Sequence, residues 1–155
     1  MKRRASITLA LLGVTLAGAV FLWPTPPAGG ILKPGDPDVT AEGARVYASY
    51  CSSCHGADLE GQPGWMEPGP DGRMPAPPHD DTGHTWHHSD ALLIAITKFG
   101  TARAAGLSGY ESDMPAFETD LTDEQIIAVL SYIKATWPDE IRKRHDALNT
   151  AIPLN

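Results

Sequence analysis

Residues 51–55 read Cys51-Ser52-Ser53-Cys54-His55, and this stretch decides the fold of the chain. The pattern C-x-x-C-H is typical of the attachment of a covalently bound haem. Two thiols at this spacing reach the two vinyl groups on one side of a porphyrin, and the adjacent imidazole comes up beneath the iron. The sequence therefore predicts one haem c, bound through thioether bonds to Cys51 and Cys54 and ligated by His55.

A bare C-x-x-C pair also occurs in dithiol redox sites and in one half of a zinc site. A zinc site needs further thiolates or a paired histidine motif. Cys51 and Cys54 are the only cysteines among the 155 residues. The cysteine count therefore favours haem over zinc.

The N-terminal segment, residues 1–23, has the pattern of a membrane anchor or a secretion signal. Basic residues at positions 2–4 precede a run without charged side chains that ends at Trp23. As a helix this run would span roughly 28 Å, close to the hydrocarbon thickness of a bilayer. Cleavage near the small residues 17–19 is the alternative, although the apolar run continues beyond them. We expect an inner-membrane anchor with the haem domain in the periplasm, or a periplasmic protein if the segment is cleaved.

The segment 24–39 is rich in proline and glycine and has no apolar periodicity, which indicates a linker. Proline makes such a linker stiffer than a Gly/Ser tether. We expect the haem domain to occupy residues 40–137 and a C-terminal tail to occupy residues 138–155.

The part of the chain after Trp23 is strongly acidic. It contains 9 Lys and Arg against 19 Asp and Glu, a net charge of −10. This balance argues against nucleic acid or an anionic membrane surface as a partner, and it favours redox proteins with a basic docking surface. The alternative is that the acidity only keeps the protein soluble.

The haem domain is expected to be all-α, because no strand pattern is found in it. Three or four short helices bury little core by themselves, so the apolar face of the haem should complete it. The expected helices are residues 41–50, 90 to about 99, 122 to about 137, and a short extra helix within 138–150.

Residues that cap or end a helix predict the boundaries of these helices. Thr40 and Ser89 are expected N-caps, and Gly100 should end the second helix. Thr122 and Gln125 have the spacing of a capping box.

The stretch from Gly43 to Trp137 resembles the class I cytochrome c family. Gly43-x-x-x-Tyr47-x-x-x-Cys51-x-x-Cys54-His55-Gly56 is similar to its N-terminal helix and haem motif, Met114-Pro115 to its distal-ligand loop, and Leu130-Ser131-Tyr132-Ile133 to its C-terminal helix. The resemblance implies that the two terminal helices cross at Gly43 against Tyr132. The whole chain is also similar to small, membrane-anchored bacterial cytochromes with a single haem.

Whether the iron has a sixth protein ligand or an open site distinguishes an electron carrier from a catalyst. The candidate thioethers are Met66, Met74 and Met114, and the resemblance places the distal ligand at Met114. A thioether ligand raises the reduction potential relative to a second histidine. The rival is one of four histidines close in sequence, which could instead bind copper or zinc in a second site; they are His79, His84, His87 and His88.

Other haem contacts are expected from the same loops. The resemblance implies that a proline carbonyl holds His55, and residues 74–78 offer three prolines, of which we favour Pro75. Trp86 and Tyr110 are candidate donors to the haem propionates, because each joins an apolar body to one polar tip. Core packing alone would also explain both.

The expected function is electron transfer by a single haem that cycles between Fe(II) and Fe(III), and we do not expect the chain to be an enzyme itself. One alternative is a haem enzyme or gas-binding protein with an open sixth site, although no acid-base pair is evident for it. Another is a cytochrome subunit of a larger oxidase or dehydrogenase.

Overall fold

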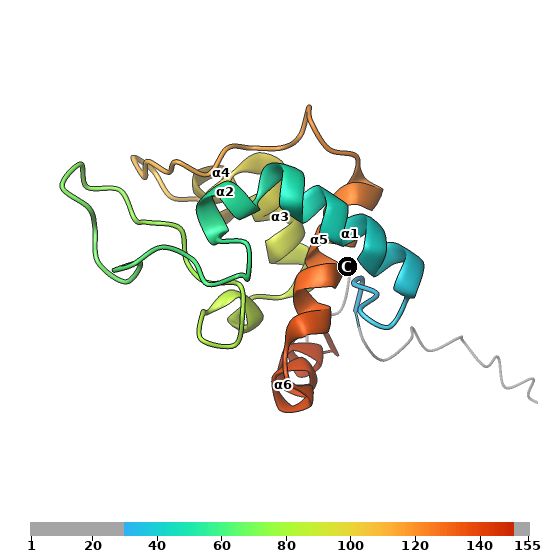
Figure 1. The fold of residues 1–155 in the computed structure, drawn as a ribbon. Helices are drawn as coiled ribbons and strands as arrows, with labels where there is room; N and C mark the ends of the chain where they lie inside the picture. The colour runs from blue at the N-terminus through green and yellow to red at the C-terminus, as the bar shows by residue number, and fades with distance from the viewer. Residues whose placement is uncertain (1–29, 151–155) are drawn as a thin grey trace, which may run out of the picture.

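The computed structural model describes residues 30–150, and this part of the chain is helical without any strand (Figure 1). The expected all-α fold is therefore confirmed. The expected anchor at residues 1–23 lies outside the described residues. The elements are α1 (Pro37–Tyr50), α2 (Ser52–His55), the 3₁₀ turn η1 (Thr85–His87), α3 (Asp90–Phe99), α4 (Thr101–Ala105), α5 (Asp123–Thr136) and α6 (Asp139–Thr150).

Helix α1 begins at Pro37, earlier than the sequence indicated. Its N-cap is Asp36, whose carboxylate accepts the backbone N–H groups of Asp38 at 3.1 Å and Val39 at 3.2 Å. Thr40 was expected to cap the helix, but it lies inside the first turn and donates its hydroxyl to the Asp36 carbonyl. A proline suits the first helical position because its missing N–H would have no partner there.

Helices α1 and α5 cross in close contact at Gly43, as the resemblance implied. A side chain at this position would meet the carbonyl oxygen of Ala128 and would lie 2.7 Å from Cβ of Tyr132. The rings of Tyr47 and Tyr132 pack next to this point, with centroids 5.6 Å apart. The absence of a side chain at Gly43 therefore sets the distance between the two helices.

The expected boundaries of α3 and α5 are confirmed. Ser89 accepts the N–H of Leu92, and Gly100 ends α3 with a φ of 81°. Thr122 and Gln125 form both bonds of the capping box at the start of α5. The short elements η1 and α4 were not predicted, because one turn of helix is too short to produce a periodic apolar pattern.

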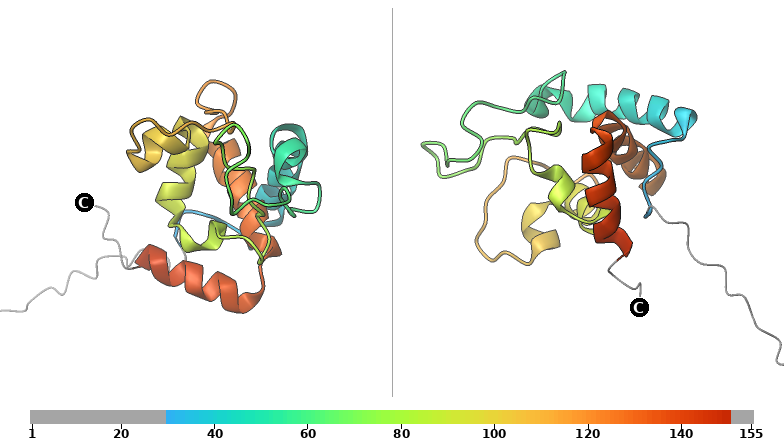
Figure 2. Two further views of the ribbon diagram at one scale, coloured as in Figure 1. Left: turned by 90° about the vertical axis from the view of Figure 1, so that its left-hand side faces the viewer. Right: turned by 90° about the horizontal axis from the view of Figure 1, so that it is seen from below.

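The C-terminal helix α6 packs against the haem domain, as Figure 2 shows, and is therefore no free tail. His145 of α6 is fully buried, and Lys134 of α5 is buried beside it with its ammonium 2.5 Å from the Asp146 carboxylate. Asp90, at the start of α3, lies 3.5 Å from the His145 ring.

The N-terminal end of the described chain is held by the same buried group. The Asp90 carboxylate accepts the backbone N–H groups of Ile31 at 2.6 Å and Leu32 at 3.0 Å, and it also accepts a bond from the Asn149 amide. The packed unit therefore extends beyond residues 40–137 at both ends. Within residues 30–150, no helix is both long enough and apolar enough to cross a membrane.

We expect Gly43→Ala to lower the free energy of unfolding of the haem-loaded protein by about 3 kcal/mol, because the new methyl group meets a backbone carbonyl that cannot turn away. Denaturant unfolding followed by circular dichroism measures the change. Gly35→Ala is the matched control, since nothing lies within 4 Å of a Cβ built there. Equal stability of the two variants would contradict the close crossing.

Candidate functional site

The haem motif occupies the junction of α1 and α2. The N–H of Cys51 bonds to the Tyr47 carbonyl at 2.9 Å, and the N–H of His55 bonds to the Cys51 carbonyl at 2.9 Å. One helical turn thus brings both cysteines and the histidine together. Both thiols are free; Cys51 is half-buried and Cys54 is exposed. Before haem is attached, burial, with a smaller effect of Cys54, raises the pKa of the Cys51 thiol to about 11.

The imidazole of His55 is buried and held through one of its two nitrogens. Its Nδ1 lies 2.9 Å from the carbonyl oxygen of Pro77, to which it donates a hydrogen bond. Burial lowers the pKa of His55, and the Pro77 bond acts in the opposite direction. A neutral ring with Nδ1–H engaged leaves Nε2 available for iron, which is the arrangement of a metal-ligating histidine.

The expected partner of His55 was Pro75, and this choice was wrong. The loop after α2 turns back on itself, because Gln62 N–H bonds to the Ala76 carbonyl and His79 N–H bonds to the Leu59 carbonyl, each at 2.8 Å. Gly61, with a φ of 69°, lies directly against the Pro77 and Pro78 backbone. This pairing brings Pro77 next to His55.

His79 packs face to face on His55. The ring centroids are 4.0 Å apart and the planes differ by 21°. Burial, together with the nearby imidazoles of His55 and His84, lowers the pKa of His79 well below its ordinary value, so the ring is neutral. A sixth ligand must stand across the porphyrin from His55, so a ring stacked on His55 does not fit that role.

The other three histidines of the cluster lie around η1. His84 stacks on Trp65 with a centroid distance of 5.3 Å and meets His88 edge-on at 5.3 Å, whereas His87 stacks on Trp86 at 3.7 Å. Among residues 30–150 there is no group of three or more His, Cys, Asp or Glu side chains that could hold a metal ion. The second metal site considered from the sequence therefore has no support here.

Two buried polar atoms fit the carboxylate groups of a haem. Nε1 of Trp86 and Nε of Arg73 are buried and have no hydrogen-bond partner within the described part of the chain. Donors of this kind are costly to bury unless a ligand satisfies them, and haem propionates are suitable acceptors. Trp86 was expected to donate to a propionate, and this role stays a prediction. Arg73 was not considered from the sequence, because its partners Asp113 and Glu111 lie about 40 positions away. Tyr110 lies on an exposed loop and forms no hydrogen bond to residues 30–150.

Arg73 also holds the loop that carries Met114. Its guanidinium pairs with Asp113 at 2.7 Å and with Glu111 at 3.3 Å. Met114 is half-buried and packs against the hydrophobic core, whereas Met66 is 73% exposed. The loop after α2 and the loop before α5 are therefore joined by these two ion pairs.

Tyr47 supports the end of the haem motif from α1. Its hydroxyl donates to the carbonyl of Gly56 at 2.8 Å and lies 3.3 Å from the carbonyl of His55. Burial, then the charges of Cys51 and Glu60, raise the pKa of Tyr47 above its usual range. The hydroxyl is therefore protonated at neutral pH and remains a donor.

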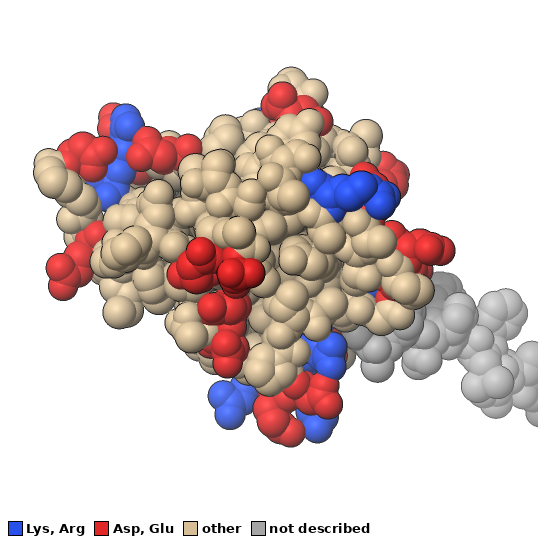
Figure 3. Space-filling view, viewed as in Figure 1, with Lys and Arg blue, Asp and Glu red and all other residues tan. Residues whose placement is uncertain are grey.

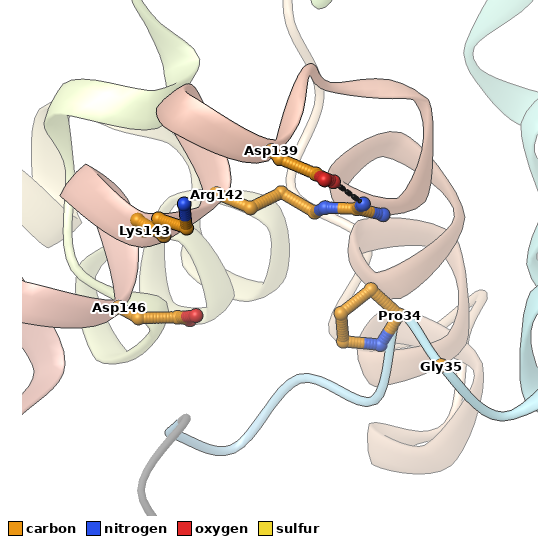
Figure 4. Close-up of a pocket in the computed structure, with 6 residues that line it drawn as sticks. All are labelled: Pro34, Gly35, Asp139, Arg142, Lys143 and Asp146. Atoms are coloured by element: carbon orange, nitrogen blue, oxygen red, sulfur yellow. Dashed lines mark hydrogen bonds and ion pairs between the residues drawn. The ribbon is translucent and has the colours of Figure 1, made fainter.

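An open hollow of about 400 Å³ lies elsewhere, between residues 34–35 and α6 (Figure 4). It is lined by Pro34, Gly35, Asp139, Arg142, Lys143 and Asp146. Arg142 pairs with Asp139 one turn away on α6, and none of the residues that line the hollow belongs to the haem motif. The hollow is therefore separate from the site of His55.

These features define a class of protein, a small all-α domain built around a covalently attached haem. Comparison with known proteins identifies the family. Residues 40–137 match the family described as Cytochrome c, and the chain belongs to this family. Haem c is accordingly its cofactor.

One relative among the curated proteins is the fructose dehydrogenase cytochrome subunit of Gluconobacter japonicus. It is 33% identical over 99 residues, which are 61% of this chain and 18% of that protein. The chain thus matches less than a fifth of the length of this relative. No solved structure gave a significant match.

The bound haem supplies an iron that takes up and releases one electron. The chain's own residues fix and orient it: Cys51 and Cys54 would hold the porphyrin edge, His55 would bind iron, and Trp86 would donate to a propionate. The Pro77 carbonyl keeps the proton on Nδ1 of His55.

We expect the double variant Cys51→Ala/Cys54→Ala to lose all haem that resists denaturing electrophoresis, because no thioether bond can form. Haem staining of the gel measures this. Ser52→Ala/Ser53→Ala is the control, since these residues lie between the cysteines and should leave the staining unchanged. Staining in the cysteine variant would contradict the assignment of the attachment site.

Proposed function

We propose that this chain is a single-haem electron carrier that cycles between Fe(II) and Fe(III), with His55 and Met114 as axial ligands and no enzymatic activity of its own. The observation that carries the proposal is the His55 imidazole, which follows the two attachment cysteines and is oriented by a backbone carbonyl at 2.9 Å. That arrangement leaves Nε2 of His55 available and correctly oriented to bind the haem iron.

Two observations support Met114 as the sixth ligand. Its loop is tied through Arg73 to the segment after the haem motif, which limits how far Met114 can move away. The Met114 side chain is also partly buried against the core, as a ligand in a closed site should be. A thioether in this position favours Fe(II) and suits an electron carrier rather than a catalyst with an open iron.

We propose that the N-terminal segment holds the protein at the inner membrane with the haem domain in the periplasm. The support comes from the basic residues at positions 2–4 and the uncharged run that follows them. The Asp90 bonds to Ile31 and Leu32 fix the point at which the linker leaves the domain.

The proposed partner is a redox protein with a basic docking surface. Figure 3 shows a group of acidic side chains near the centre of one face. Glu60 and Asp80 both lie close enough to Tyr47 to raise its pKa, so their charges converge beside the haem motif. Acidic charge at this place would steer a basic partner towards the haem.

A second candidate is a cytochrome subunit that is permanently bound to a dehydrogenase. The relative from Gluconobacter japonicus favours it, because it is itself the cytochrome subunit of such an enzyme. A mobile carrier exchanges partners by diffusion, whereas a subunit stays bound. The two candidates therefore differ in whether the full chain is extracted from its host alone or with a larger partner.

Replacing Met114 by Ala should leave the haem attached, lower the reduction potential and open the iron to added imidazole or azide, because only the distal bond is removed. Redox titration and ligand binding followed by absorbance measure both effects. Met66→Ala is the control, since Met66 is 73% exposed. An unchanged potential in the Met114 variant would exclude Met114 and make Met74 the next thioether to test.

Electron exchange with a basic redox protein should slow as salt shortens the Debye length from about 30 Å at 0.01 M to about 10 Å at 0.1 M. Stopped-flow rates of the full chain in detergent measure this. Glu60→Gln/Asp80→Asn should weaken the salt dependence, because it removes two charges beside the haem motif. Asp120→Asn/Glu124→Gln, at the start of α5, removes the same charge as a control. Identical behaviour of the two variants would exclude docking at the haem-motif side.

A further inference from the structure

The ring of His79 stacks on His55 of the haem motif, and electron transfer as described so far gives it no role. Its N–H bonds to the Leu59 carbonyl at 2.8 Å, its carbonyl accepts Nε1–H of Trp137 at 2.8 Å, and its Nδ1 lies 2.8 Å from the Thr85 hydroxyl. These partners come from the loop after α2, the end of α5 and η1. Three separate elements therefore fix both the backbone and the ring of His79.

The direction of the Thr85 bond follows from its second neighbour. The Thr85 oxygen lies 3.4 Å from the Pro78 carbonyl, which can only accept, so the hydroxyl donates there and accepts Nδ1–H of His79. This bond fixes the rotation of the His79 ring. The fixed ring then lies flat against His55, at a centroid distance of 4.0 Å and an interplanar angle of 21°.

The Pro77 carbonyl alone does not fix the plane of His55. A single hydrogen bond at Nδ1 sets the tautomer and the direction of the ring, but it tolerates rotation of the ring about the line through its two nitrogens. A flat partner on one face opposes that rotation, because turning the ring would break the stacking contact.

We propose that His79 is a positioning residue that sets the plane of the iron-binding imidazole of His55. The His79 ring and backbone are held by Thr85 of η1 and by Trp137. The orientation of the His55 ring therefore depends on how η1 and the end of α5 are packed. The plane of an axial imidazole determines which iron orbital it overlaps, so the orientation is visible in the spectra of the ferric protein. The proposal rests on haem ligation by His55, as given under the proposed function.

The test uses the haem-loaded full chain in the ferric state. His79→Leu introduces an apolar side chain of similar size without a flat ring, and His79→Phe keeps a flat ring without the Thr85 bond. We expect His79→Leu to change the spread of the haem methyl resonances and the g values, and His79→Phe to stay closer to the native spectra. His87→Leu, whose native ring stacks on Trp86 instead, is the matched control and should leave both spectra unchanged.

Native spectra in His79→Leu, or an equal change in His87→Leu, would overturn the proposal. If His79→Leu takes up no haem, Thr85→Val decides, because it leaves the His79 ring in place but frees its rotation. Haem methyl resonances and g values that differ from the wild type in Thr85→Val support the proposal, and native spectra in Thr85→Val would then overturn it. The wild-type spectrum shows whether a histidine ligates the iron at all, so failure of the proposed function is distinguished from failure of this proposal.

Discussion

The fold depends on the contact between α1 and α5 at Gly43. Because a side chain there would meet the Ala128 carbonyl, the two helices approach more closely than helices with larger residues at the crossing. The haem motif begins directly after α1, so the crossing also fixes where the motif lies relative to α5. Tyr47 takes part in both the helix crossing and the haem motif. Its ring packs on Tyr132 of α5, and its hydroxyl donates a hydrogen bond to the carbonyl of Gly56.

The motif and the loop after it contribute different things to the site. Residues 51–55 provide the attachment points and the ligand within little more than one helical turn. The loop provides orientation, because its backbone pairing presents the Pro77 carbonyl to Nδ1 of His55 and places His79 flat against the ring. A backbone carbonyl is a suitable partner for orienting His55, since it accepts a hydrogen bond but does not change its own charge when the iron changes oxidation state.

A cluster of buried polar side chains away from the haem motif holds both ends of the domain. Asp90 binds the chain at residues 31 and 32, while His145 and the Lys134–Asp146 pair attach α6 to α3 and α5. Buried charges are expensive unless they are paired, so removing one partner should cost more than the pair contributes as a whole. Such a group gives the linker one defined exit from the domain, which a purely apolar contact would fix less specifically.

The sequence by itself determined the cofactor, its attachment residues, the helical class and the capped boundaries of α3 and α5, because each depends on neighbours within about five positions. It did not determine which proline faces His55, the role of His79 or the presence of Arg73 at the Met114 loop. Each of these depends on contacts between residues far apart in the chain, such as the 22 positions from His55 to Pro77 and the 40 from Arg73 to Asp113. Local patterns carry no information on how a loop folds back, so only the tertiary structure decided them.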